Sequence, residues 1–228
     1  MEELLERYEA GGDESVYAEA RRSYEQALAA DGDARLLVEF GYLQELHGSR
    51  SIRAAVECYE QAIDADPQYD KPHWQLIHAM ATLGQAAQAV SRYQQWAAAA
   101  PADLRPRRFL AAACMSARDY DNAGQVIRDG LELAPDDPML TVLHGELLEA
   151  AGRPDDALAA WQHAVTLGPD DMSPRYSMAL LLERQGRLAE AVAQWRAIIT
   201  WCEEHGYAIS ADWPRRELQR LETRLAGS

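Results

Sequence analysis

The sequence predicts an all-α protein in which pairs of helices repeat along the chain as a solenoid, and three observations lead to this prediction. Prolines recur every 34 residues, at Pro67, Pro101, Pro135 and Pro169. Turn residues ahead of them keep the same period, at Gly84, Arg118, Gly152 and Gly186. Between each turn and the next proline, small and large residues stand at helical spacing. A fixed period of this length is typical of repeats that bury their apolar faces against one another.

The second helix of each expected repeat carries a small residue, a large residue four positions later and usually another small residue three positions after that. The clearest instances are Ala20, Tyr24, Ala27; Ala55, Tyr59, Ala62; and Ala157, Trp161, Ala164. Looser instances are Ala89, Tyr93, Trp96; Ala123, Ile127, Gly130; and Ala191, Trp195, Ile198. Spacings of three and four place these residues on one helical face. We expect the small residues to admit a second helix closely and the large residue to fill the space beside it.

An upstream helix precedes each of these, as in residues 36–46 and 141–150, where Gly41 and Gly145 stand at the expected crossing of two helices. This unit resembles the tetratricopeptide repeat over almost the whole chain, closely in its second helix and loosely in its first. The resemblance implies a right-handed superhelical solenoid of about six repeats, whose first helices line a concave groove. We expect one domain over 1–228, with repeats at roughly 1–33, 34–69, 70–103, 104–137, 138–171 and 172–205.

The tail over 212–226 is expected to form a last helix. Asp212 can cap it, Pro214 suits its first turn, and Leu218, Leu221 and Leu225 form an apolar stripe. A helix of this kind would cap the final repeat, which has no neighbour on its outer side. The alternative is a detachable helix that binds a partner.

Charge and composition exclude several functions. The 228 residues carry 37 acidic and 22 basic side chains, a formal charge of −15, which disfavours binding to nucleic acid or to anionic membranes. The sequence has neither a secretory signal nor a membrane-spanning stretch, so we expect a cytoplasmic protein. Its three cysteines are expected to be reduced. The single lysine among many arginines, together with abundant alanine, hints at a bacterial source.

Catalytic signatures are missing from the sequence, so we expect no enzyme activity. Motifs for metalloproteases, nucleophile elbows, phosphate loops and dinucleotide binding are all absent. The six histidines are scattered, and His73 and His78 lie on different faces of one helix, so neither a metal nor another cofactor is expected. The paired acids at 136–137, 155–156 and 170–171 fall at helix starts, where they favour the helix dipole.

Residues 70–79, DKPHWQLIHA, are the most unusual stretch. Asp70 can cap the first helix of the third repeat, with Pro72 in its first turn. Spacing puts Lys71, Trp74 and His78 on one stripe, which the resemblance turns toward the groove. His73 and Ile77 are expected to point into the packing. A shift of one residue would bury Trp74 instead.

The same count in the neighbouring repeats adds groove residues to Lys71, Trp74 and His78. They are Tyr42 in the second repeat and Arg105, Arg108 and Phe109 in the fourth. Glu146, Glu149 and Glu183 make the far end acidic, and Tyr176 leaves one aromatic residue there. A basic and aromatic groove in an acidic protein would attract a protein or peptide partner of acidic and aromatic character. The alternative is that Arg105 and Arg108 only pair with acids of adjacent repeats.

The function that we expect is a non-enzymatic protein-interaction scaffold or adaptor that holds a partner peptide in its groove. Some relatives of this family grip a chaperone's terminal carboxylate through a clamp that needs two asparagines. Asn122 is the only asparagine here and falls in a second helix, so this clamp cannot form. Two alternatives stay open. The convex surface or the last helix could bind the partner, or the groove could sense a small molecule or peptide signal and regulate an enzyme.

Overall fold

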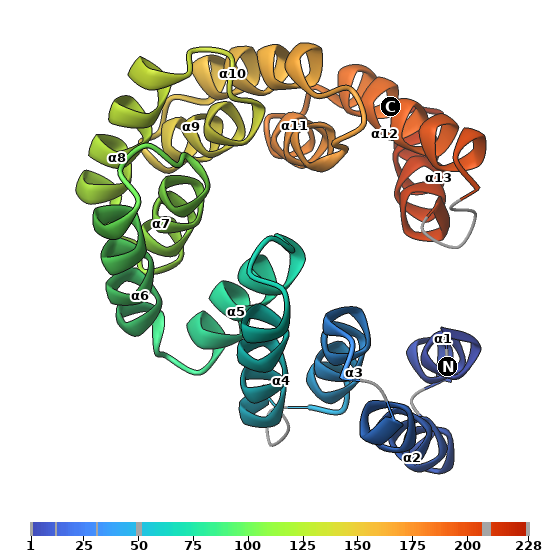
Figure 1. Cartoon of the computed structure of the whole chain (residues 1–228). Helices are drawn as coiled ribbons and strands as arrows, with labels where there is room; N and C mark the ends of the chain where they lie inside the picture. The colour runs from blue at the N-terminus through green and yellow to red at the C-terminus, as the bar shows by residue number, and fades with distance from the viewer. Residues whose placement is uncertain (1, 12, 31, 49–51, 207–210, 227–228) are drawn as a thin grey trace. The chain divides into compact units, whose positions relative to one another are not determined.

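The computed structural model describes residues 2–11, 13–30, 32–48, 52–206 and 211–226, and these residues form helices and turns with no strand (Figure 1). The thirteen helices within these ranges are α1 (Glu2–Gly11), α2 (Glu14–Ala30), α3 (Ala34–Leu46), α4 (Ile52–Ala65), α5 (Lys71–Thr82), α6 (Ala86–Ala99), α7 (Arg105–Ser116), α8 (Tyr120–Leu133), α9 (Pro138–Ala150), α10 (Pro154–Leu167), α11 (Ser173–Arg184), α12 (Leu188–Glu204) and α13 (Asp212–Ala226). The all-α prediction is confirmed. The helices alternate at the spacing of the six predicted pairs, followed by α13.

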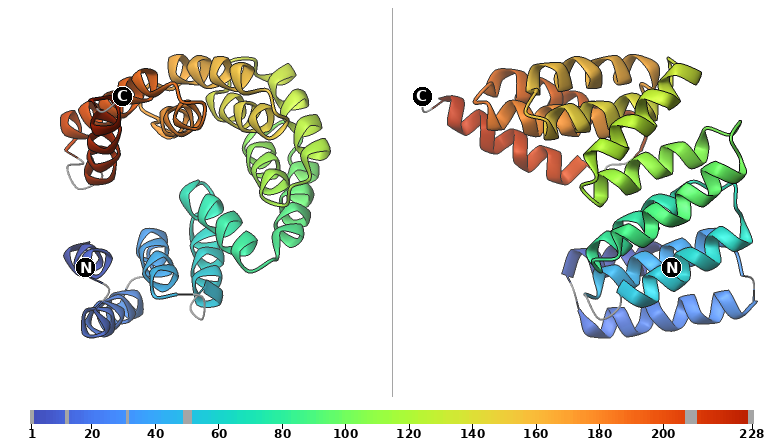
Figure 2. Two further views of the ribbon diagram at one scale, coloured as in Figure 1. Left: turned by 180° about the vertical axis from the view of Figure 1, so that it is seen from behind. Right: turned by 90° about the vertical axis from the view of Figure 1, so that its left-hand side faces the viewer.

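The chain divides into two compact units, Met1–Ala123 and Gly124–Ser228, called unit 1 and unit 2 below. The boundary lies inside α8. In unit 1, α3 packs against α4, α4 against α5, and α6 against α7; in unit 2, α9 packs against α10, α11 against α12, and α12 against α13 (Figures 1 and 2). Packing of successive helices is the arrangement that the repeat pattern predicts. The single domain over 1–228 stays a prediction.

The turns between paired helices explain why the glycine period is so regular. Gly84, Gly152 and Gly186 follow the first helices of their repeats with φ of 72°, 72° and 75°. This left-handed conformation is easy for glycine and costs other residues about 1–2 kcal/mol. Arg118 occupies the equivalent position of the fourth repeat with φ of 58°. The fourth turn therefore keeps the geometry of the others despite its arginine.

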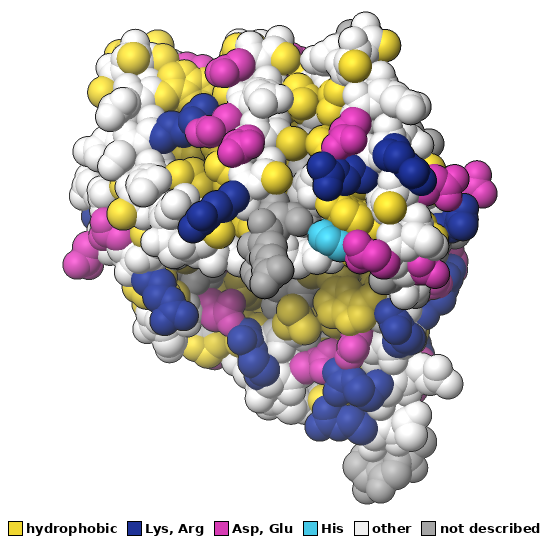
Figure 3. All heavy atoms as spheres, turned by 90° about the horizontal axis from the view of Figure 1, so that it is seen from below, with side chains coloured by type: hydrophobic (Ala, Val, Ile, Leu, Met, Phe, Trp, Pro, Cys, Tyr) yellow, Lys and Arg dark blue, Asp and Glu magenta, His cyan; other side chains and the backbone are white. Residues whose placement is uncertain are grey.

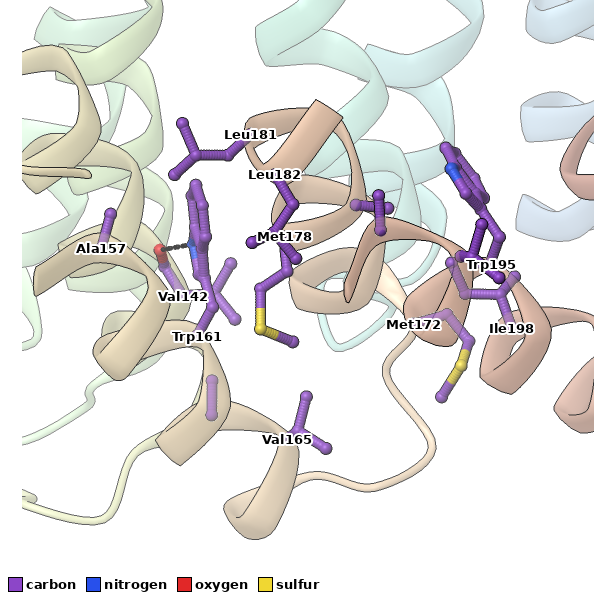
Figure 4. Close-up of a cluster of buried hydrophobic side chains, with 14 of the residues drawn as sticks. Val142, Ala157, Trp161, Val165, Met172, Met178, Leu181, Leu182, Trp195 and Ile198 are labelled. Atoms are coloured by element: carbon purple, nitrogen blue, oxygen red, sulfur yellow. Dashed lines mark hydrogen bonds between the residues drawn. The ribbon is translucent and has the colours of Figure 1, made fainter. Parts of the chain in front are cut away.

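The small and large residues of the second helices form the centre of the core in every repeat. The small residue that opens each pattern and the large residue four positions later are at most 1% exposed: Ala20, Tyr24, Ala55, Tyr59, Ala89, Tyr93, Ala123, Ile127, Ala157, Trp161, Ala191 and Trp195. In unit 2, Trp161 points between α9 and α11, and its Nε1 donates a hydrogen bond of 3.2 Å to the carbonyl oxygen of Val142 (Figure 4). The packing prediction for the second helices is confirmed.

Gly41 and Gly145 lie where the helices of a pair cross, as the sequence predicts. A Cβ atom added to Gly41 would stand 2.5 Å from Cε1 of Tyr59, and one added to Gly145 would overlap the indole of Trp161. Tyr59 and Trp161 therefore each pack directly on a glycine of the first helix of their pair. Any side chain at these positions would push the two helices apart.

The C-terminal helix α13 packs against α12, as expected for a cap. Leu221 is fully buried and Leu218 partly buried, whereas Leu225 is 40% exposed. The predicted apolar stripe therefore covers the last repeat with its first two leucines only.

The crossing at Gly145 leads to a stability prediction. We expect Gly145→Ala to lower the free energy of unfolding by about 1–3 kcal/mol, because the new methyl group overlaps Trp161. Gly124→Ala is the control, because its Cβ would meet only the ends of two flexible side chains, a methyl group of Leu147 at 3.3 Å and a guanidinium nitrogen of Arg128 at 3.4 Å. Urea unfolding followed by circular dichroism measures both variants. Equal stability of the two variants would contradict the close crossing at Gly145.

Candidate partner-binding site

All seven residues predicted for the groove lie in unit 1, on the first helices of three successive repeats. Tyr42 is on α3, Lys71, Trp74 and His78 are on α5, and Arg105, Arg108 and Phe109 are on α7. Lys71 and His78 are exposed, and Tyr42, Trp74 and Arg108 are partly buried. Their assignment to a partner-binding surface stays a prediction, and their surroundings decide which of them a partner could touch.

An aromatic cluster joins α5, α6 and α7 beneath this surface. The His73 ring stacks on Phe109 with centroids 4.5 Å apart and on Trp96 at 5.0 Å. Tyr93 lies 5.5 Å from Phe109, and Trp74 meets the same ring edge-on at 4.8 Å. His73 and Ile77 are 2% and 3% exposed, so their predicted inward orientation is confirmed. Because aromatic contacts of this kind have preferred geometry, they hold the three helices in one arrangement.

Phe109 is 1% exposed, which corrects the expectation that its ring is offered to a partner. The ring of Phe109 packs against both His73 and Trp74 within the aromatic cluster. Trp74 is partly buried, an intermediate state between the full exposure and the full burial that the sequence left open. The Trp74 side chain is therefore packed against Phe109 and still partly exposed to solvent, so a partner could contact an aromatic ring that is already held in place.

Arg105 is held by the preceding repeat. Its Nε donates to Oδ1 of Asp70 at 3.0 Å and its Nη2 to the carbonyl oxygen of Pro67 at 2.8 Å. Its guanidinium carbon also lies 5.6 Å from the centre of the Trp96 ring. These contacts agree with the alternative that this arginine pairs with an adjacent repeat. They also correct the expected role of Asp70, which stands at the N-cap position of α5 but makes no capping hydrogen bond.

A group of polar side chains lies where α3 meets α5. Glu45 on α3 is close enough to His78 for their charges to interact, and burial raises the pKa of its carboxyl group. One of its oxygens and the hydroxyl of Tyr59 are buried without a well-formed hydrogen bond among the described residues, although the two groups are neighbours. Burial, followed by the carboxylates of Glu9 and Glu45, raises the pKa of Tyr42 to about 12. Tyr42 therefore acts as a neutral hydrogen-bonding group at physiological pH.

Glu45, Gln68 and Trp96 are parts of the site that the sequence did not identify. Glu45 could have been found, because it follows Tyr42 by three residues and so shares its helical face. Gln68 accepts a hydrogen bond of 2.5 Å from Arg105, and Trp96 stacks on His73. Both of these contacts depend on how repeats are placed side by side, which spacing within one helix does not show.

Positive charge at the site is smaller than the sequence suggests. Asp70 neutralises Arg105 at 3.0 Å, and Glu45 lies beside His78. Charged side chains elsewhere are also mixed. On the face shown in Figure 3, lysine and arginine alternate with aspartate and glutamate around hydrophobic side chains. Lys71, three residues before Trp74 on α5, is exposed and adds positive charge to that helix.

Chemical sites of other kinds receive little support. Cys58, Cys114 and Cys202 are buried, and burial raises the pKa of all three thiols. Within the described parts of the chain, no group of three or more histidine, cysteine or acidic residues is placed to hold a metal ion. Asp137 caps α9 by accepting a hydrogen bond of 2.9 Å from the backbone of Leu140, in line with the structural role expected for the paired acids. Among the described helices, none has the length and apolar character needed to cross a membrane.

Similarity to known proteins agrees with the helix pairs. Tetratricopeptide-repeat family models match residues 42–69 and 142–200, one segment in each unit. The solved structure of TTC0263, a thermophilic TPR protein of Thermus thermophilus, is 22% identical, covers 85% of this chain and 99% of its own, and superposes with a TM-score of 0.57. This likeness supports the fold.

Two further solved structures are more distant. MamA from Desulfovibrio magneticus RS-1 is 18% identical, covers 75% of this chain and 96% of its own, and has a TM-score of 0.47. YrrB, described as a TPR protein with an unusual peptide-binding site, is 15% identical, covers 82% of this chain and 96% of its own, and has a TM-score of 0.45. No curated protein matches the sequence significantly.

The successive helix pairs define the chain as an all-α helical-repeat protein. The family matches make the assignment specific for two segments: residues 42–69 and 142–200 are tetratricopeptide repeats.

The buried His73 makes the stability of the folded state depend on pH. Burial lowers its pKa from 6.5 to about 4, and the charges of Arg105 and Arg92 act in the same direction, whereas Asp70 opposes them. The carbonyl of Pro67 also acts to raise this pKa, although it makes no well-formed hydrogen bond to the ring. Nε2 of His73 has no hydrogen-bond partner among the described residues. The folded state therefore keeps this imidazole neutral, while the unfolded chain takes up a proton below pH 6.5.

Stability should fall as the pH drops from about 6.5 to about 4, by up to about 3 kcal/mol from this group. We expect His73→Phe, which keeps a ring beside Phe109, to remove this part of the loss. Denaturant unfolding of both proteins across the window measures the difference. The same slope in the wild type and the variant would contradict a neutral, buried His73.

Proposed function

We propose that the chain is a protein-interaction scaffold that holds a partner segment on the exposed surface of α3, α5 and α7 in unit 1. The partly exposed Trp74, fixed on the aromatic cluster, is the observation that carries this proposal. Lys71 stands three residues before Trp74 on α5. Arg108 on α7 occupies the repeat position that Trp74 has on α5, 34 residues later in the sequence. Tyr42 and His78 complete the surface.

A fixed aromatic side chain is well suited to binding. Trp74 loses little conformational freedom when a partner covers it, because Phe109 already holds one edge of its ring. Aromatic residues of this kind contribute much of the affinity at protein interfaces. Arg105 and Phe109 have a supporting role in this proposal, because they connect the repeats beneath Trp74.

Charge favours a partner segment with acidic and aromatic residues. Lys71 lies exposed beside Trp74 in a chain whose formal charge is −15, so a carboxylate is attracted here more than elsewhere. Proteins built from tetratricopeptide repeats are generally interaction modules without catalytic activity, which supports a scaffold.

A small-molecule sensor is the second candidate, and a cavity in unit 2 favours it. The cavity has a volume of about 430 Å³, within the usual range for ligand sites. Its lining includes His144, His163, Arg153 and Asp156, and Arg153 and Asp156 pair at 2.7 Å. Saturable thermal stabilisation by a metabolite, lost in His144→Ala, would favour this function over the scaffold.

Lys71→Glu and Trp74→Ala test the scaffold proposal. The probe is a labelled peptide of about twelve residues that contains glutamate and phenylalanine, followed by fluorescence anisotropy. We expect Trp74→Ala to weaken binding about tenfold, through loss of the aromatic contact, and Lys71→Glu to weaken it about fivefold, through repulsion.

Arg22→Glu on α2 is the matched control, because it makes a similar change of charge on another exposed part of unit 1. Its affinity for the peptide should stay within about twofold of the wild type. Equal weakening by Arg22→Glu and Lys71→Glu would mean that only the net charge matters, and the proposed surface would be wrong.

A further inference from the structure

Unit 2 presents an aromatic pair, an exposed tryptophan on a partly buried tyrosine, that the proposed function does not use. Trp213, at the start of α13, is 42% exposed although its ring is packed on two sides. It stacks on Tyr176 of α11 with ring centres 5.5 Å apart and an interplanar angle of 15°. Trp195 packs against it in a T-shaped arrangement, with ring centres 5.1 Å apart and an interplanar angle of 82°. The indole is therefore held in place and still accessible, as a partner-binding anchor needs to be.

A leucine extends this aromatic surface along α11. Leu180 follows Tyr176 by four residues, one helical turn, and is 42% exposed. Large apolar side chains exposed together are more informative than one alone, because a folded chain gains nothing from leaving them in water. Tyr176, Leu180 and Trp213 are called the aromatic face of unit 2 below.

Ion pairs place acidic residues beside the aromatic face. Arg184 of α11 pairs with Glu149 of α9, and Arg220 of α13 pairs with Glu183 of α11. These contacts bring α9, α11 and α13 together along one side of unit 2 (Figure 1). Glu183 also accepts a hydrogen bond of 2.9 Å from Nε1 of Trp195, so the acidic network and the aromatic cluster are joined.

Carboxylates exceed guanidinium groups in this network. Its carboxylates are Glu146, Glu149, Asp171, Glu183 and Glu217, and its guanidinium groups are those of Arg184 and Arg220. Burial of Glu146, together with the charges of Glu149 and Asp171, raises its pKa to about 7. Glu146 is therefore only partly ionised near neutral pH, and the charge of the network comes mainly from the other four carboxylates.

We propose that the aromatic face of unit 2 and its acidic residues bind a protein segment in which an arginine or lysine stands beside an apolar side chain. The cation would lie over the accessible ring of Trp213 and near the carboxylates, where both interactions attract it. The apolar side chain would cover Leu180. This surface prefers a partner charge opposite to that expected at Lys71 and Trp74 in unit 1, so the two surfaces would take different segments.

Two labelled peptides of about twelve residues test this proposal, one with arginine and leucine at alternate turns and the other with glutamine in place of each arginine. Fluorescence anisotropy should detect binding of the arginine peptide, and the glutamine peptide should bind about tenfold more weakly. Leu180→Ser and Trp213→Ala should each weaken the arginine peptide about fivefold or more. Because Trp213→Ala also removes packing on Tyr176, Leu180→Ser is the decisive variant.

Leu133→Ser is the matched control, because Leu133 is also an exposed leucine of unit 2, at 62%. It should leave the affinity unchanged, and so should Trp74→Ala, whose effect on the acidic peptide tests the other surface. The proposal is overturned if the arginine peptide does not bind at about 1 mM, if Leu180→Ser and Leu133→Ser behave alike, or if the glutamine peptide binds equally well. If Leu180→Ser instead abolishes self-association in sedimentation experiments and leaves peptide binding unchanged, the occupant is a second copy of this chain and the proposal fails.

Discussion

The buried large residue at the centre of each second helix is the feature on which every repeat depends, and in two repeats it packs on a glycine of the first helix. Tyr59 against Gly41 and Trp161 against Gly145 show it most directly. One helix of a pair cannot bury its apolar face alone, so each repeat is stable only when a neighbour covers it. Within unit 1, the first helix α5 keeps one side partly free of this packing, and that side carries Trp74.

Sequence periodicity predicted the helices, their pairing and the buried residues, because each of these depends on spacing within one repeat. Gly145 and Trp161 were identified in this way, and so was the inward orientation of His73. The predicted site was less accurate. Phe109 is buried and Arg105 is engaged by Asp70, because both contacts form between repeats. A pattern within one helix identifies the face of a residue but not the neighbour that covers it.

The sequence predicts the net charge of the chain but not the local charge at the candidate site. The formal charge of −15 excludes no local basic site, and the sequence placed such a site around Lys71, Arg105 and Arg108. Ion pairs reduce its strength, since Arg105 is neutralised at 3.0 Å.

At the acidic end of the chain the sequence singled out Glu183 and Tyr176, which both contact Trp195. It could not show that Trp213 stacks on Tyr176, because these residues are far apart in sequence and meet only through α13.

Hydrogen exchange measured by mass spectrometry, with and without the acidic, aromatic peptide, tests the central claim most directly. The account predicts slower exchange in Lys71–Thr82 and Arg105–Ser116, the helices that carry Trp74 and Arg108, and unchanged exchange in Asp212–Ala226. Exchange that is unchanged at saturating peptide in these two helices, or slowed only in the C-terminal helix, would contradict a partner site on the first helices of unit 1.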